Sequence, residues 1–340
     1  MKKIIKEPWG HAPDGSEVFR WTLSGDKLSV SIINFGATVQ RMTYDGRDII
    51  FSLPDVEKYA KFSFACIGAT VGRYAGRIAG GEFCLNGVKY RLTQNHEGNH
   101  LHGGAQGFHT KVWDGDIVDC DGSQGLELHL FSPDGSEGYP GDLNVSAVFT
   151  VTQDDRFQIV YRAKCDKKDT ILNLTNHCYF NLNGIRTNTS SFPESDSDNN
   201  DVELMVNADF ITEQVNSLPT GKLLPVDGTP FDFRTPKILA CDMSSAEETA
   251  KNGYDHFFVL REQEPNRPSV TAYSRRSGIF MECFTNRPGV QLFTMGNPGD
   301  AFALEAQSFP DAPNHPNFPT TVLRAGEEWC GRIIYQFSTK

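Results

Sequence analysis

The chain has 340 residues, of which 39% are hydrophobic and 11% aromatic, so it can fill one large or two modest cores and whole-chain disorder is excluded. Its 43 acidic residues outnumber its 32 basic ones, and the formal net charge of -11 makes nucleic acid and anionic membranes poor partners. A neutral small molecule is not repelled by such a surface.

The sequence carries no signal for export or membrane insertion. Residues 1–10 lack the apolar stretch of a secretory signal, and no window approaches the roughly 20 apolar residues that span a bilayer. The eight cysteines are scattered singly, without a Cys-x-x-Cys pair. We therefore expect a cytoplasmic protein whose cysteines are free thiols, buried or half-buried.

Taken in chain order, the predicted elements are short strands separated by turns. Residues 55–60 could form one or two helical turns, and Asn86-Gly87 between two apolar runs predicts a β-hairpin. Apolar and polar residues then alternate over residues 126–130, 145–151 and 157–163, which predicts strands with one face on a core.

The second half of the chain continues the strand pattern. Residues 186–201 are rich in Ser, Asp and Asn and predict an exposed loop, whereas residues 244–251 resemble a capped helical turn. Many short strands without intervening helices indicate an all-β, mostly antiparallel sandwich. No repeat or linker divides the pattern, so a single domain over residues 1–340 is expected.

The first polar segment combines arginines, glycines and histidines. Arg73 and Arg77 are flanked by glycines, which fits either a backbone that approaches a ligand or a surface ion-pair patch. His96, His100 and His102 follow, but no Cys or carboxylate completes a recognisable metal set, so no metal site is expected.

Two further segments place a polar group inside an apolar run. His177 lies in the apolar residues 172–182, and Tyr179 points to the same face of that strand. A lone strand histidine is more often structural, although the neighbouring hydrogen-bonding groups favour a site. Glu305 interrupts another apolar run, where a carboxylate is costly to bury unless it is paired or functional. An exposed position on an edge strand is the alternative.

Together these segments resemble the aldose 1-epimerase family, over nearly the full chain. The matching segments, in the family's order, are residues 34–38, 72–78, 101–104, 175–182, 252–256, 287–291 and 304–311.

The resemblance implies an activity and a set of roles. The fold would be a large, galactose mutarotase-like β-sandwich with a sugar cleft, and the reaction would interconvert the α and β anomers of free hexoses such as galactose and glucose. His177 matches the family's general acid and Glu305 its general base. No cofactor or metal is implied; the partner is a small sugar, and the chain would be a monomer or weak homodimer. The positions that match sugar-binding residues are Arg77, His102, Tyr179, Asp255 and Gln291.

One position departs from the family pattern. Gly76 stands where the family usually has Asn, immediately before the second arginine. The change removes one amide from the cleft and leaves the preferred sugar open.

The implied reaction needs two proton movements. The C1 hydroxyl loses a proton while the ring oxygen gains one; the ring opens, C1 rotates about the C1–C2 bond, and the steps reverse. One carboxylate and one imidazolium on opposite sides of the hemiacetal are sufficient. We expect an ionised Glu305, because glutamate has a reference pKa near 4.3, and a protonated His177, favoured by the nearby negative charge.

Three rival functions share some of these residues. A sugar-binding protein would need the cleft but no acid and base. An epimerase of hexose 6-phosphates would need cations for the phosphate, from Arg73, Arg77 or the pair Arg275-Arg276. A glycoside hydrolase would use two carboxylates, which Glu305 and Asp255 could imitate, and would leave His177 without a task.

Overall fold

The computed structural model describes residues 3–120, 122–185, 201–246, 253–261, 267–295 and 301–340. Nearly all of the predicted loop 186–201 and most of the predicted helical turn 244–251 lie outside these ranges. Within them, no helix is long and apolar enough to cross a membrane.

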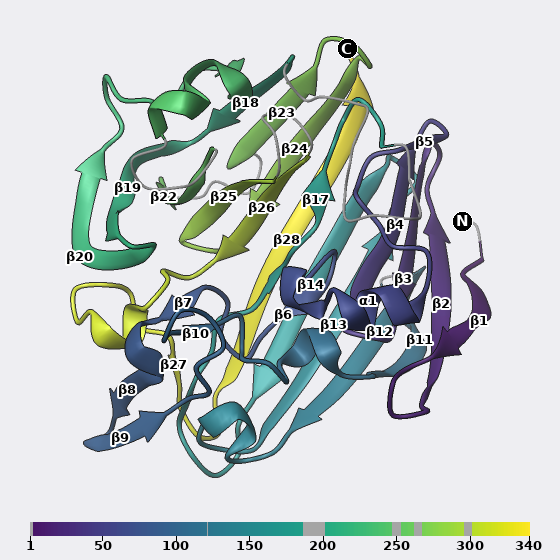
Figure 1. Cartoon of the computed structure of the whole chain (residues 1–340). Helices are drawn as coiled ribbons and strands as arrows, with labels where there is room; N and C mark the ends of the chain where they lie inside the picture. The colour runs from purple at the N-terminus through teal and green to yellow at the C-terminus, as the bar shows by residue number, and fades with distance from the viewer. Residues whose placement is uncertain (1–2, 121, 186–200, 247–252, 262–266, 296–300) are drawn as a thin grey trace.

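The largest layer is a nine-stranded antiparallel sheet. It runs diagonally through the molecule, and the C-terminal strand lies at its centre (Figure 1). In spatial order its strands are β11 (Asp114–Cys120), β12 (Ser123–Ser132), β13 (Leu143–Val151), β14 (Arg156–Lys164), β28 (Glu328–Thr339), β24 (Ile279–Thr285), β23 (Val270–Ser274), β18 (Val202–Val206) and β21 (Lys237–Ile238).

Two smaller antiparallel sheets pack on one face of this layer and share one hydrophobic core with it (Figure 1). The first contains β1 (Ile5–His11), β2 (Glu17–Ser24), β3 (Leu28–Ile33), β4 (Thr38–Tyr44) and β5 (Arg47–Asp48). The second contains, in spatial order, β17 (Tyr179–Phe180), β26 (Ala301–Gln307), β25 (Gly289–Met295), β22 (Asp255–Leu260), β19 (Ala208–Val215) and β20 (Leu218–Pro225).

The predicted strand alternation is confirmed in the nine-stranded sheet. Leu126 and Leu128 on β12, and Phe157 and Ile159 on β14, are fully buried in the shared core, while the residues between them are more exposed. Burying one such side chain contributes about 1.5–3 kcal/mol, so the period of two determines which face of each strand packs inward. The all-β sandwich predicted from the sequence is therefore correct.

The described residues also form short two-stranded ladders. The turn Asn86-Gly87 joins β8 (Glu82–Leu85) to β9 (Val88–Arg91) in a hairpin, as predicted. The ladders are formed by β6 (Thr70–Val71) with β16 (Thr175–Asn176), β7 (Arg77–Ile78) with β10 (His100–Leu101), β8 (Glu82–Leu85) with β9 (Val88–Arg91), and β15 (Thr170–Ile171) with β27 (Val322–Leu323).

Helical structure is sparse. The predicted turns at 55–60 form α1 (Val56–Lys61), whose first turn is capped because the Asp55 carboxylate accepts a hydrogen bond from the Lys58 amide at 2.8 Å. The described part of the predicted turn at 244–251 is the end of a 3₁₀ segment. The 3₁₀ segments are η1 (Ser63–Ala65), η2 (Ala79–Gly81), η3 (Phe108–Thr110), η4 (Ser136–Gly138), η5 (Leu239–Ala246) and η6 (Ala312–Asn314).

The cysteines match the expectation only in part. All eight are free, but Cys84, Cys241 and Cys330 are exposed rather than buried or half-buried. Cys84 on β8 and Cys330 on β28 lie on the outward face of their strands, because buried residues alternate with them.

Candidate active site

The floor of the candidate site is the outer face of the six-stranded sheet. On β26, Leu304 and Ala306 point into the shared core, whereas Glu305 and Gln307 point to the opposite face and line a cavity of about 490 Å³. Glu305 is only 3% exposed, so the alternative of an exposed edge residue is wrong. The strand is covered on both faces, which explains why the sequence around Glu305 is almost entirely apolar.

The register of the strands aligns the predicted site residues across the sheet. Directly opposite Glu305 lies Gln291 on β25, and opposite Gln291 lies Phe257 on β22. The neighbouring row crosses the sheet through Tyr179, Ala303, Phe293 and Asp255. Four strands from three separate parts of the chain thus contribute to one surface.

His177 reaches this surface from the segment between β16 and β17. Two hydrogen bonds anchor its backbone. The His177 amide donates to the Ala69 carbonyl at 3.0 Å, and the His177 carbonyl accepts from the Gly68 amide at 2.9 Å. Its ring lies against the Tyr179 ring, with centroids 4.7 Å apart. The predicted shared face of these two residues is confirmed.

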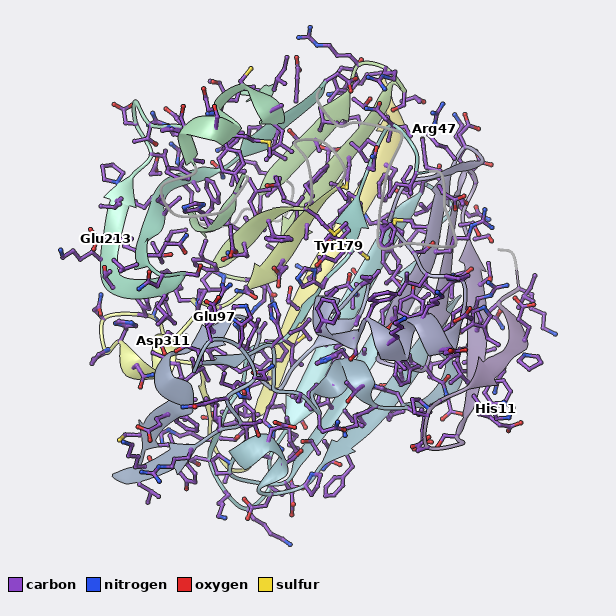
Figure 2. All side chains as sticks on the ribbon, in the orientation of Figure 1. His11, Arg47, Glu97, Tyr179, Glu213 and Asp311 are labelled. Atoms are coloured by element: carbon purple, nitrogen blue, oxygen red, sulfur yellow. The ribbon has the colours of Figure 1, made fainter. Side chains whose placement is uncertain are left out.

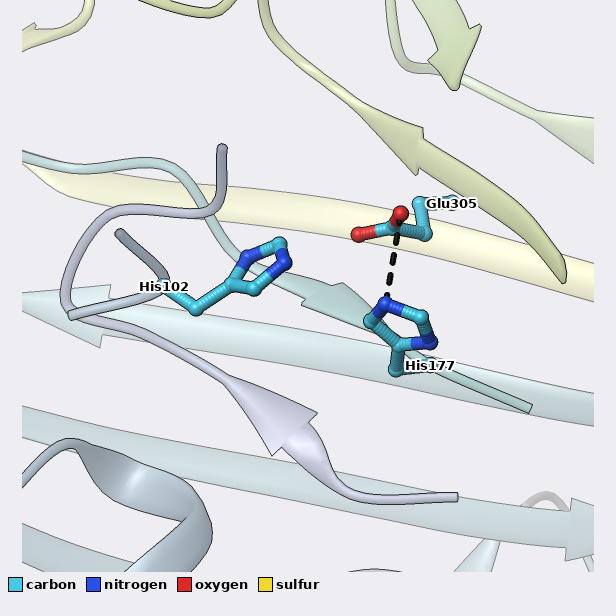
Figure 3. A group of neighbouring side chains, drawn as sticks. All are labelled: His102, His177 and Glu305. Carbon is cyan, nitrogen blue, oxygen red and sulfur yellow. Dashed lines mark ion pairs between the residues drawn. The ribbon is translucent and has the colours of Figure 1, made fainter. Parts of the chain in front are cut away.

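His177 and Glu305 are direct neighbours. Figure 3 shows the imidazole pointing at the carboxylate, and the distance from His177 Nε2 to Glu305 Oε1 is 3.4 Å. We expected the two groups on opposite sides of the hemiacetal; in this structure they lie side by side. This arrangement still suits a hemiacetal, because its ring oxygen and its hydroxyl oxygen are bonded to the same carbon.

The wall of the cavity comes from two loops that hold each other. The Gly76 amide donates to His102 Nδ1 at 3.2 Å, and the His102 amide donates to the Gly76 carbonyl at 3.1 Å. Gly76 has a φ of +81°, a conformation that few residues other than Gly and Asn adopt readily. With Nδ1 occupied as an acceptor, neutral His102 carries its proton on Nε2, the ring nitrogen that faces His177 and Glu305 (Figure 3).

Asp255 is held by two of the other predicted residues. Its carboxylate accepts a hydrogen bond from Gln291 Nε2 at 2.6 Å and lies 3.4 Å from Arg77 Nη2. The structure thus brings His177, Glu305 and all five predicted sugar-binding positions to one cavity. Those five are Arg77, His102, Tyr179, Asp255 and Gln291.

Burial reverses the expected protonation states. It raises the pKa of Glu305 to about 8, with Asp255 adding to the rise and Arg77 opposing it. It lowers the pKa of His177 to about 4, against the weaker opposing effects of a backbone hydrogen bond and of Asp255. Both shifts run opposite to the expected carboxylate and imidazolium, because desolvation favours the neutral form of each group. Near neutral pH the pair holds one proton, on Glu305.

Tyr179 contributes its ring more than its hydroxyl proton. The hydroxyl donates to the Ala65 carbonyl at 2.9 Å, so that proton is engaged within the protein. In Figure 2, Tyr179 lies near the middle of the molecule, whereas Glu213 on the hairpin β19–β20 lies at its edge.

Arg73 and His100 are structural. The Arg73 guanidinium is buried and donates to the carbonyls of Pro140, Gly141 and Ser132, at 2.8–3.0 Å. The two nitrogens of His100 lie 2.6 Å from the Thr93 carbonyl and 2.6 Å from the Tyr139 hydroxyl. Of the two arginines in the glycine-rich segment, Arg77 alone lines the cavity, so neither sequence interpretation holds for Arg73.

Three side chains approach the arrangement of a metal site. His102, His177 and Glu305 each offer one donor atom, and these atoms all lie within 4.8 Å of one another. The protonation of His102 opposes a metal here. Metal binding through Nε2 would move the proton to Nδ1, where it would face the Gly76 amide, and the hydrogen bond between them would be lost.

Sequence reasoning assigned no role to several lining residues. Phe257 and Phe293 form apolar parts of the cavity, and Gln307 contributes a buried amide. Gln307 was detectable in principle, because it lies two residues after Glu305 and so shares its strand face. Thr212 and Gln214 on β19 were not detectable, since only the register of the folded sheet brings them to the cavity.

The fold and the site define a class of protein: a large antiparallel β-sandwich with an acid–base pair at the floor of a cavity that polar and apolar side chains line together. The sequence profile of the family "Aldose 1-epimerase" matches residues 20–336. The chain belongs to this family.

Individual relatives match over almost their whole length. Galactose mutarotase from Rattus norvegicus is 34% identical, over 99% of each chain, and aldose 1-epimerase from Escherichia coli K12 is 32% identical, over 98% of this chain and 99% of the other. The crystal structure of galactose 1-epimerase from Lactobacillus acidophilus NCFM superposes with a TM-score of 0.84 at 28% identity, and it covers 100% of this chain and 99% of that one.

Proposed function

We propose that the protein is a mutarotase that interconverts the α and β anomers of free hexoses such as galactose and glucose. The observation that carries the proposal is the buried contact between His177 and Glu305 at the floor of a cavity that both polar and apolar side chains line. The relatives named for galactose mutarotation and for aldose 1-epimerisation support the reaction class.

In the proposed mechanism Glu305 is the base and His177 the acid. The single proton of the pair lies on Glu305 in the free site, and its transfer to His177 creates the carboxylate and imidazolium that the reaction uses. Glu305 then accepts the proton of the C1 hydroxyl, and His177 donates to the ring oxygen. The open aldehyde rotates about the C1–C2 bond, and the reverse proton movements close the ring as the other anomer. Positioned acid and base groups each contribute typically about 10²–10⁴-fold to such a step.

The remaining cavity residues would orient the sugar. Asp255 is oriented by Gln291 and Arg77, so its carboxylate is available at a defined position for sugar hydroxyls. His102 would donate from Nε2, because its Nδ1 is already an acceptor. For Tyr179 we propose contact through the ring and through the lone pairs of a hydroxyl whose proton is engaged.

The rival functions receive less support. Among the described residues that line the cavity, Arg77 is the only Lys or Arg, and its partner is Asp255, which disfavours a 6-phosphate. Arg275 pairs with Glu203 on β18 of the nine-stranded sheet, and Arg276 pairs with Asp201, which directly precedes β18. A hydrolase would need Asp255 as its second carboxylate, and it would leave the contact between Glu305 and His177 without a task.

Further parts of the proposal concern the whole chain. We propose that residues 1–340 form a single domain, a monomer or weak homodimer that acts in the cytoplasm without metal or cofactor. The eight unpaired cysteines support the cytoplasmic location.

Polarimetry of freshly dissolved α-galactose and α-glucose tests the function. We expect the protein to accelerate the approach to the equilibrium rotation for the free sugars, and to act weakly on their 6-phosphates. A spontaneous rate with every sugar, together with measurable sugar binding, would instead indicate a non-catalytic sugar-binding protein.

A further inference from the structure

The side chain of Gln307 is a buried amide beside the acid–base pair. One hydrogen-bonding group of this amide is unused in the described part of the chain. Gln307 ends β26, two residues after Glu305, and is only 1% exposed, yet it lines the cavity. Its Oε1 atom has no hydrogen-bond partner among the described residues. A buried polar atom left unpaired costs about 1–3 kcal/mol, so the protein keeps this amide at a cost in stability.

The amide lies next to the position where this chain departs from its family. A Cβ atom added at Gly76 would lie 3.4 Å from Gln307 Nε2 and 3.2 Å from Pro310 Cβ. A side chain at position 76 would therefore contact the Gln307 amide. With glycine there, position 76 places no side chain against this amide.

We propose that the Gln307 amide binds a hydroxyl of the sugar on the side of the ring that faces Gly76. This inference rests on the proposed function, since it assigns a further substrate-binding residue to the same site. Nε2 donates to the hydroxyl oxygen; if the amide turns by half a revolution, Oε1 accepts the hydroxyl proton instead. In the turned orientation the sugar hydroxyl provides Oε1 with the partner that the described residues do not.

The same geometry gives Gln307 a part in specificity. The hydroxyl that it contacts is the one nearest the 72–77 loop, where the usual Asn of the family would present its own amide. In this chain the selection at that hydroxyl passes to β26, the strand that also carries Glu305. Gln307 is therefore a binding residue. We expect its loss to weaken sugar binding much more than it lowers the turnover rate of bound sugar.

Substitution of Gln307 by Met tests the proposal, because Met has a similar length and no amide. We expect Gln307→Met to raise the KM for galactose about 5- to 10-fold, the worth of one hydrogen bond, with kcat within about 2-fold. Its melting temperature should be unchanged or higher, because an unpaired buried group is removed.

The matched control is Gln40→Met. Gln40 is also a buried strand glutamine, but both ends of its amide have partners: Nε2 donates to the Leu53 carbonyl and Oε1 accepts from Arg20, each at 3.3 Å. This variant should melt at a lower temperature and keep its KM.

Two outcomes would overturn the inference. One is a Gln307→Met variant with the KM of the wild type; the other is a fall in melting temperature like that of Gln40→Met without a change in KM, which would make Gln307 structural.

Equilibrium dialysis of galactose against the wild type and Gln307→Met separates this failure from that of the proposed function. A wild type that binds galactose but does not turn it over overturns the mutarotase proposal, and the loss of affinity in Gln307→Met still decides the role of the amide.

Discussion

Glu305 and His177 form a pair in which burial, and not the attraction between charges, controls the proton. The pKa of Glu305 is raised to about 8 and that of His177 is lowered to about 4, so one proton is held over the range between them. Whether the proton lies on the carboxylate or on the imidazole, the protonation state of the pair as a whole is the same. A neutral pair also avoids placing isolated charges in a buried site.

This shared proton predicts a bell-shaped pH dependence of kcat/KM. Above about pH 8 Glu305 loses the proton and the pair has no acid, whereas below about pH 4 His177 gains a second proton and the pair has no base. We expect a plateau between these limits, measured by polarimetry in matched buffers and corrected for the spontaneous rate. An alkaline decline that begins near pH 5, close to the ordinary pKa of a carboxyl group, would contradict the account.

At the residue scale, the sequence identified the acid and base candidates but not their charge. His177 and Glu305 stood out because each polar group interrupts an apolar strand. The protonation states depend on depth of burial, which follows from the second layer of the sandwich and not from neighbours in the sequence. For the same reason Arg73 and Arg77 looked equivalent, although only one lines the cavity.

At the scale of elements, the site is a consequence of strand register. Glu305, Gln291 and Phe257 meet because β26, β25 and β22 pair without a bulge in this region. A shift of one residue would turn the carboxylate into the core and Leu304 into the cavity. Alternation within each strand was predictable from the sequence, but the order of strands from distant parts of the chain was not.

Asp255 links this sheet to the 72–77 loop, and its replacement by Asn tests that link. The substituted amide can still accept a hydrogen bond from Gln291 but no longer forms an ion pair with Arg77, so we expect Asp255→Asn to raise the KM for galactose about tenfold or more. Steady-state polarimetry measures the change. Asp209→Asn is the control, because Asp209 pairs with Arg261, on the same sheet but outside the cavity. Equal KM values in the two variants would refute the role of Asp255.

At the scale of the whole molecule, buried imidazoles make the fold sensitive to acid. Burial lowers the pKa of His109 and of His256 to about 4, and it also lowers those of His100 and His102. The unfolded chain binds these protons near pH 6.5, so the stability that these groups contribute is present above pH 6.5 and is lost as the pH falls toward 4. Glu305 acts in the opposite direction, since its raised pKa favours the folded state at low pH and that contribution is lost as the pH rises through about 8.

We therefore expect the free energy of unfolding to fall as the pH is lowered from 6.5 to 4.5. Over this range, unfolding should be accompanied by a net uptake of more than one proton. Each fully buried histidine contributes a slope of about 1.4 kcal/mol per pH unit. Urea titrations at several pH values give this slope. His109→Gln should reduce this slope by the contribution of about one proton. His129→Gln should leave the slope unchanged, because His129 is exposed. A stability independent of pH over this range would contradict the neutral state of the buried histidines.

The central claim is that Glu305, paired with His177, carries the chemistry, and one polarimetric comparison tests it most directly. Freshly dissolved α-galactose is followed with the wild type and with Glu305→Gln, whose amide keeps the shape of the side chain but cannot serve as a base. The account predicts an unchanged fold by circular dichroism and a loss of about 10²–10⁴-fold in kcat. A folded Glu305→Gln variant with near-normal turnover would contradict it.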